Sequence, residues 1–168
     1  MLRLFSLLLA GALLLSACTA TDYTGTSAGS SNNVYRIRSG DTSKIQFRML
    51  DSVNSLRSAA GAGPVQLNSQ LTAAAATHSR DMSVQNRPWH FGSDGSSPID
   101  RVQRAGYTGR FLGENISETY ETEIETLGAW MDQPGTRSVI LDPSAVNMGF
   151  SWYQEKGGKI WWTLVMGG

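Results

Sequence analysis

Residues 146–166, VNMGFSWYQEKGGKIWWTLVM, decide the fold that we expect for this chain. From Val146 to Tyr153, apolar side chains alternate with others, which is the period of a β-strand with one apolar face. From Ile160 to Met166 the alternation resumes, after a turn that contains Gly157 and Gly158. Two such runs around a Gly-Gly turn predict a β-hairpin. Because little follows the second run, we expect its strand to be central in the sheet.

The aromatic face of this hairpin needs a cover, and the preceding residues supply three amphipathic helices. Apolar side chains recur at helical spacing through residues 45–56, 71–82 and 124–131. Each run is preceded by capping residues, which are Ser39–Ser43, Asn68, and Thr119 or Thr122. The runs end at Gly or Pro, at Gly61–Pro64 for the first and Pro134–Gly135 for the third. The economical arrangement is an α+β fold, with a small antiparallel sheet packed between helices.

Shorter segments connect these elements. Residues 34–38 alternate and are either an edge strand or the lead-in to the first helix, whereas residues 65–67 form a connector. Residues 91–98 predict a turn-rich loop, residues 99–105 a short helix, and Gly113–Ile116 lies in a second loop. Four acidic residues crowd the start of the third helix, where the helix dipole explains them without a metal: Glu118, Glu121, Glu123 and Glu125.

The loop–helix–loop region holds the most reactive pair of side chains in the sequence. His90 precedes the short helix and Glu114 follows it, so the chain can bring the imidazole against the carboxylate across a cleft. His78, the other of the two histidines, lies on the apolar face of the second helix. Such a histidine is usually buried against a backbone carbonyl, and the alternative for His78 is a part in the cleft.

Residues 1–18 have the pattern of an export signal. Leu4–Leu15 is an apolar run that is too short to span a bilayer as a helix. It ends in Leu15-Ser16-Ala17-Cys18, which resembles the lipobox of bacterial lipoproteins, so we expect Cys18 to be lipidated. The alternative is a plain secretory signal in which Cys18 is incidental. Residues 19–34 are rich in Ser, Thr and Gly and predict a flexible tether to a domain at residues 35–168.

The composition limits the classes of partner that we expect, and the export signal indicates the compartment. Basic and acidic residues number 14 each without a basic run, so we expect no nucleic-acid partner. Cys18 is the only cysteine, so the exported domain must be stable without an internal disulfide. We expect a monomer, anchored to the membrane through Cys18 and facing the periplasm or the cell exterior. Thr19 resembles the residue type that directs lipoproteins to the outer membrane rather than the inner one.

Several short motifs follow one another in a fixed order through residues 45–166. They are the Leu71–Met82 run, Trp89-His90-Phe91, Asp100-Arg101, Ala105-Gly106-Tyr107, Gly113-Glu114-Asn115-Ile116, Trp130-Met131, Pro134-Gly135 with Arg137, Ile140-Leu141, and Val146 with Met148-Gly149. This ordered set resembles the bacterial branch of the CAP superfamily, the SCP-like extracellular domain of cysteine-rich secretory proteins, antigen 5 and plant pathogenesis-related proteins. The resemblance implies a three-layer α-β-α sandwich.

In animal members of that family, a cleft carries two histidines and two glutamates. His90 matches the first histidine and Glu114 the first glutamate. The second glutamate would fall near Gln133 and the second histidine near Trp161. Many bacterial members have a substitute histidine where this chain has Thr136. The resemblance therefore implies a cleft that retains two of its four polar groups.

A cleft of this kind favours ligand binding without catalysis. The polar groups would be His90 and Glu114, and apolar walls would come from Trp89, Tyr107 and Trp161. Members of the family are associated with sterol, lipid or glycan ligands, so we expect a lipid, a glycan or peptidoglycan fragment, or a protein. The pair could also be purely structural and hold two loops together.

Two kinds of chemistry remain as alternatives. A hydrolase would use His90, oriented by Glu114, to activate Ser96 or Ser97, but no motif resembles a nucleophile elbow. Zinc needs three or four ligands, and His78 would have to join His90 and Glu114 as the third. We therefore expect no cofactor, or zinc bound only weakly.

Overall fold

A computed structural model describes residues 35–118 and 120–168, so the predicted signal, Cys18, the tether and Thr119 lie outside the described residues. The elements are η1 (Ser39–Asp41), α1 (Thr42–Ala59), β1 (Gln66–Leu67), α2 (Ser69–Gln85), α3 (Pro98–Arg104), β2 (Phe111–Ser117), α4 (Glu123–Asp132), α5 (Pro134–Ile140), β3 (Asn147–Gln154) and β4 (Ile160–Gly167). None of the described helices combines the length and the apolar composition that crossing a bilayer requires.

The predicted hairpin is formed by β3 and β4, and it organises a four-stranded sheet of order β1-β3-β4-β2. β4 pairs antiparallel with both of its neighbours, so the prediction that the last strand is central is confirmed. Residues 66–67, interpreted as part of a connector, are a short strand parallel to β3. The sheet is therefore mixed rather than wholly antiparallel.

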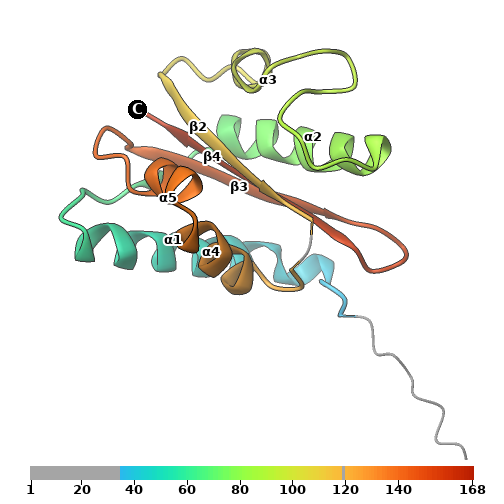
Figure 1. The fold of residues 1–168 in the computed structure, drawn as a ribbon, viewed down its shortest axis with the longest axis horizontal. Coiled ribbons are helices and arrows are strands. Elements are labelled where there is room, and N and C mark those ends of the chain that lie inside the picture. Colours follow the sequence, from blue (N-terminus) through green and yellow to red (C-terminus); the bar gives the residue numbers. More distant parts are fainter. Residues whose placement is uncertain (1–34, 119) are drawn as a thin grey trace, which may run out of the picture. The chain divides into compact units, whose positions relative to one another are not determined.

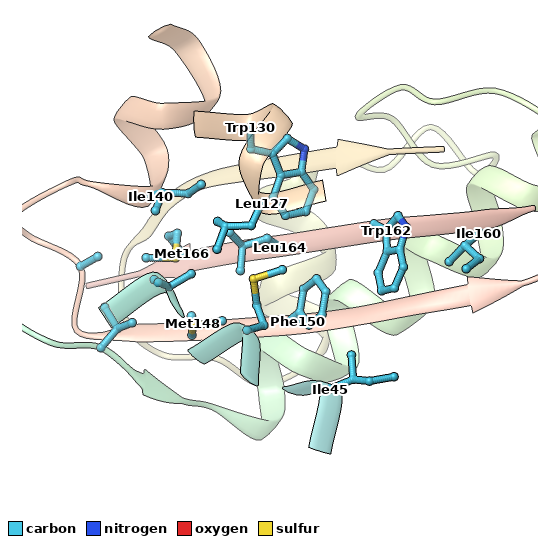
Figure 2. Packing of buried hydrophobic residues seen from close by; sticks show 14 residues of the cluster. Ile45, Leu127, Trp130, Ile140, Met148, Phe150, Ile160, Trp162, Leu164 and Met166 are labelled. Carbon is cyan, nitrogen blue, oxygen red and sulfur yellow. The ribbon is translucent and has the colours of Figure 1, made fainter. Parts of the chain in front are cut away.

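Helices cover both faces of this sheet, which confirms the α-β-α sandwich (Figure 1). α2 and α3 pack on one face, where Leu71 and Val102 meet Val165. α1, α4 and α5 pack on the other, around the aromatic pair Phe150 and Trp162, whose stacked rings lie 5.7 Å apart (Figure 2). Both faces of β4 are consequently buried.

The strand β2 was wrongly predicted as loop. Gly113–Ile116 lies within it, and its backbone pairs with β4 so that Glu114 is opposite Val165. The segment FLGENIS contains glycine, glutamate and asparagine, which are depleted in strands, so it carries no local strand signal. Pairing with the long central strand overrides that weak preference.

Helix ends follow the predicted caps in part. Asn68 accepts from the amide of Leu71, and Thr122 forms a capping box with Glu125. The first helix has no side-chain cap and begins after the short turn η1 instead. Pro134 ends the third predicted helix but also starts α5, because proline fits the first turn of a helix.

Two charged side chains are buried at the α1 side of the sheet. Glu123 is fully buried and forms an ion pair with Arg48 of α1, so the helix dipole alone does not explain it. The guanidinium of Arg57, also in α1, is fully buried and donates to four backbone carbonyls, those of Gly63, Ile140, Asp142 and Ala145. It therefore joins the end of α1 to the α5–β3 connection.

Residues 35–38 form no strand and are the lead-in to α1. The side-chain amide of Gln154, at the end of β3, donates to the carbonyl of Tyr35 and accepts from the amide of Ile37. Residues 35–38 are therefore held against the turn end of the β3–β4 hairpin.

Candidate functional site

Four side chains from separate segments meet at the edge of the sheet formed by β2. Glu114 comes from β2, Arg101 from α3, His78 from α2, and His90 from the loop that follows α2. The Nδ1 atom of His90 lies 2.9 Å from Oε1 of Glu114, so the two residues predicted to meet across the loop–helix–loop region are in contact. The Nη2 atom of Arg101 donates to both oxygens of Glu114, at 3.0 and 2.9 Å.

Arg101 is the residue of this cluster that the sequence interpretation did not assign to the site. Its side chain is only 5% exposed, and Nη1 donates to the carbonyl of Ser96 at 3.1 Å. A buried carboxylate is costly unless it is paired and hydrogen-bonded, and Arg101 provides both for Glu114. The signal available in the sequence was an arginine beside the apolar Val102 in the short helix, which is a weak one.

His78 is fully buried beside this pair. Its Nε2 donates to the carbonyl of Trp89 at 2.9 Å and lies 3.6 Å from Oε1 of Glu114. Burial lowers the pKa of His78, Glu114 opposes this shift, and Arg101 adds to it. The backbone carbonyl predicted for His78 is present, and the neutral imidazole also lies against the carboxylate of the site.

Three of the four side chains are buried, and His90 is the exposed one. The side chain of Glu114 is 2% exposed and that of His90 is 50% exposed. Nδ1 of His90 is directed at Glu114, and no hydrogen bond joins its Nε2 to another described residue. His90 is therefore the member of the cluster that a ligand can reach.

The expected apolar walls are placed differently. Trp161 is fully buried on the α2 face, with Nε1 donating to Glu155 at 2.7 Å, and Tyr107 is also buried. Trp161 therefore forms no wall of an open cleft, because α2 covers that face of the central strand. Tyr107 instead lies beside the end of that strand, where its hydroxyl donates to the carbonyl of Gly168 at 3.3 Å. Trp89 stays partly exposed beside Phe91, with the guanidinium of Arg87 3.8 Å from its ring centre.

A groove of about 260 Å³ runs along the β2 edge next to this cluster. Its lining combines aromatic, apolar and polar side chains: Pro88, Ile116, Ser117, Glu118, Tyr120, Ala129, Trp130, Gln133 and Thr136. Pro88 and Ile116 are each two residues from a member of the His90–Glu114 pair. We call this hollow the β2 groove.

Comparison with known proteins identifies the family. The model of the cysteine-rich secretory protein family, CAP, matches residues 50–166. The chain belongs to the CAP family. Protein YkwD of Bacillus subtilis (strain 168) is 29% identical to it over 125 residues, which are 74% of this chain and 48% of YkwD. The chain thus spans about half the length of this relative.

Solved structures share the CAP fold. An outer surface protein from Borrelia burgdorferi superposes with a TM-score of 0.69 at 13% identity, over 76% of this chain and 94% of that one. An extracellular protein with an SCP domain from Bacillus anthracis str. Ames has a TM-score of 0.67 at 23% identity, over 76% and 41% of the two chains. At these identities the likeness concerns the fold alone.

Two of the three positions at which this CAP domain departs from the family pattern, Gln133 and Thr136, line the β2 groove, whereas the third, Trp161, does not. Gln133 is exposed there, and the hydroxyl of Thr136 donates to the carbonyl of Trp130 at 2.6 Å. The amide of Asn115 donates to the Thr136 carbonyl at 2.9 Å. A hydroxyl and an amide thus stand where the resemblance implied an imidazole and a carboxylate.

The donor set of the site does not fit a metal ion. Within residues 35–118 and 120–168, no three or more His, Cys, Asp or Glu side chains are grouped to hold one. The positive charge of Arg101 already occupies both oxygens of Glu114, and Nε2 of His78 is directed at a carbonyl. A cation at the carboxylate would have to displace the guanidinium.

The serines of the intervening loop have other partners. The hydroxyl of Ser97 donates to Asp100 at 2.7 Å and caps α3. The hydroxyl of Ser96 is hydrogen-bonded to Asp94, which helps to lower the pKa of that carboxyl. Neither serine has a hydrogen bond to His90 among the described residues, so His90 does not activate either of them in this geometry.

Proposed function

We propose that this CAP protein is an exported, membrane-anchored binding module whose ligand contacts His90 and the β2 groove at the bacterial cell envelope, without catalysis. The observation that carries the proposal is the division of the site into a buried support and one exposed imidazole. Glu114 and Arg101 fix the orientation of His90 through Nδ1, which leaves Nε2 as a polar contact of defined direction. Binding sites typically combine few such polar groups with an apolar wall.

The lining of the β2 groove favours a glycan fragment among the ligands considered. Tyr120 is exposed and offers ring surface, while Gln133, Glu118 and Ser117 are polar side chains suited to hydroxyl and amide groups. At about 260 Å³ the groove has the size of a single sugar ring. An N-acetylated sugar of the cell wall meets these requirements.

Export and anchoring rest on residues 1–18 and on the relatives. The lipobox-like Leu15-Ser16-Ala17-Cys18 supports lipidation at Cys18. The fold neighbours described as an outer surface protein and an extracellular protein support a location outside the cytoplasm. Replacing Cys18 with serine should release the protein from the membrane fraction of cells, and retention of the variant there would contradict the anchor.

Ligand binding is tested with the full chain in mild detergent and tri-N-acetylglucosamine as the probe, by isothermal titration. We expect saturable binding that His90→Ala weakens about tenfold, the effect of one good polar contact. Lys44→Ala, at an exposed position on α1, is the matched control and should bind like the parent. Equal binding by the His90 variant, or binding only to phosphatidylglycerol vesicles, would reject the glycan proposal.

A further inference from the structure

A second hollow, of about 410 Å³, lies between α2, the 92–97 loop and α3. It shares no lining residue with the β2 groove, although Arg101, the partner of Glu114, lines it. Its volume is within the range of sites that bind small molecules. We call it the α2–α3 pocket.

Small side chains form the apolar part of this pocket. Ala73, Ala74 and Ala105 line it, and the hydroxyl of Thr77 donates back to the carbonyl of Ala73 at 2.9 Å. Because α2 and the end of α3 face each other through alanines, a space remains between them that larger side chains would fill. The alanine-rich sequence of α2 therefore produces the hollow.

Two carboxylates converge on one part of the lining. Asp81 and Asp94 both line the pocket, and the 92–97 loop holds both in place. Asp81 accepts from the amide and the hydroxyl of Ser93, at 2.7 and 2.5 Å, and Asp94 accepts from the amide of Ser96 at 2.9 Å. Hydrogen bonds from Ser96, first through its hydroxyl and then through its amide, and the contact with Arg104 lower the pKa of Asp94. This carboxylate therefore stays ionised beside Asp81.

Two guanidinium groups complete the lining. Arg104 donates to Asp94 at 2.5 Å and is exposed at the rim. Arg101 is 95% buried, and its Nε–H has no hydrogen-bond partner among the described residues. A buried donor without a partner costs free energy, so an acceptor on a ligand would be stabilised there.

We infer that the α2–α3 pocket binds a small zwitterion of amino-acid or dipeptide size, with its ammonium at Asp81 and Asp94, its carboxylate at Arg101 and Arg104, and small side chains against the alanines. The lining carries two charges of each sign, and Arg101 and Arg104 are also paired with Glu114 and Asp94, so a ligand with a large net charge is disfavoured. The unpaired Nε–H of Arg101 is the donor that the carboxylate satisfies.

The test is isothermal titration of the full chain in mild detergent with L-alanyl-L-alanine. We expect saturable binding that Ala73→Leu weakens at least tenfold, because the larger side chain fills the pocket. Ala76→Leu is the matched control, since Ala76 is also exposed on α2 but does not line the pocket. The same dipeptide with an acetylated amino end and an amidated carboxyl end should not bind.

Absence of dipeptide binding, or equal binding by the Ala73→Leu variant, would overturn the inference. Equal binding of the blocked dipeptide would also overturn it, because the charges would then play no part. The outcome is independent of the proposed glycan site, since His90→Ala should leave dipeptide binding unchanged and Ala73→Leu should leave sugar binding unchanged.

Discussion

Both carboxylate oxygens of Glu114 accept hydrogen bonds from Nη2 of Arg101, at 3.0 and 2.9 Å. One of these oxygens, Oε1, also lies 2.9 Å from Nδ1 of His90. The negative charge is buried, whereas the imidazole that it orients is half exposed. A permanent cation thus compensates the carboxylate, and His90 can change its contacts without leaving a buried charge unpaired.

Removal of Arg101 should destabilise the domain strongly. Arg101→Met leaves Glu114 buried without its ion-pair partner, and such a loss costs about 3–5 kcal/mol. Urea unfolding followed by circular dichroism measures the difference. The comparison is Arg104→Gln, which breaks an exposed pair and should cost far less. Equal effects of the two changes would contradict the compensating role of Arg101.

The stability of the fold should depend on pH through His78. Burial lowers its pKa from the ordinary 6.5, so below about that pH the unfolded chain binds more protons than the folded chain. The free energy of unfolding should therefore be nearly constant well above pH 6.5. It should fall as the pH decreases from about 6.5 to 5.

The measurement uses urea unfolding in a His90→Gln background, where His78 is the single remaining histidine. Adding His78→Gln should flatten the change between pH 7.5 and 5, even if the overall stability is lower. The same slope with and without His78 would show that another group is responsible.

Gly149 should tolerate no side chain. A Cβ there would overlap the backbone of Leu71 and Thr72, so α2 would have to move away from β3. We expect Gly149→Ala to cost about 1–3 kcal/mol or more of the free energy of unfolding. Gly128→Ala, in α4 with nothing within 4 Å, should instead stabilise the protein by about 0.5–1 kcal/mol. A neutral Gly149→Ala would contradict this close approach.

Arg57 should be essential for the α5–β3 connection. Arg57→Met would leave four carbonyls without their charged donor, and hydrogen bonds to a charged group contribute about 1.5–3 kcal/mol each. We therefore expect a loss of more than about 3 kcal/mol in thermal or chemical unfolding. Arg110→Met, at an exposed position, is the control and should change stability by less than about 0.5 kcal/mol. Comparable losses would mean that the carbonyl contacts of Arg57 are dispensable.

The elements with a clear period were predictable from the sequence, and those without one were not. The hairpin and helices α1, α2 and α4 have apolar residues at strand or helix spacing, so their existence and buried faces followed from it. β2 has no such spacing, and its pairing with residues 162–167 depends on a partner far along the chain. Its strand structure is a tertiary effect.

The site was predictable to a similar extent. A loop, a short helix and a return of the chain sufficed to place His90 near Glu114. Arg101 was missed because an arginine beside Val102 in a short helix is normally solvated, and only the three-dimensional contact reveals its burial. Trp161 was assigned to the cleft because the resemblance aligns it with a cleft histidine, and that alignment does not show that α2 covers its face of β4.

The central position of β4 also has a consequence for the order of assembly. β2 and β3 are its neighbours in the sheet but precede it in the chain, and they pair with it rather than with each other. During synthesis or export, neither can complete its backbone pairing until residues 160–167 have emerged. Folding of the sheet should therefore be late and nearly all at once, since its closure depends on contacts between distant segments. A chain cut before residue 160 would keep its helical segments and β3 but lose the central strand of the sheet on which they pack.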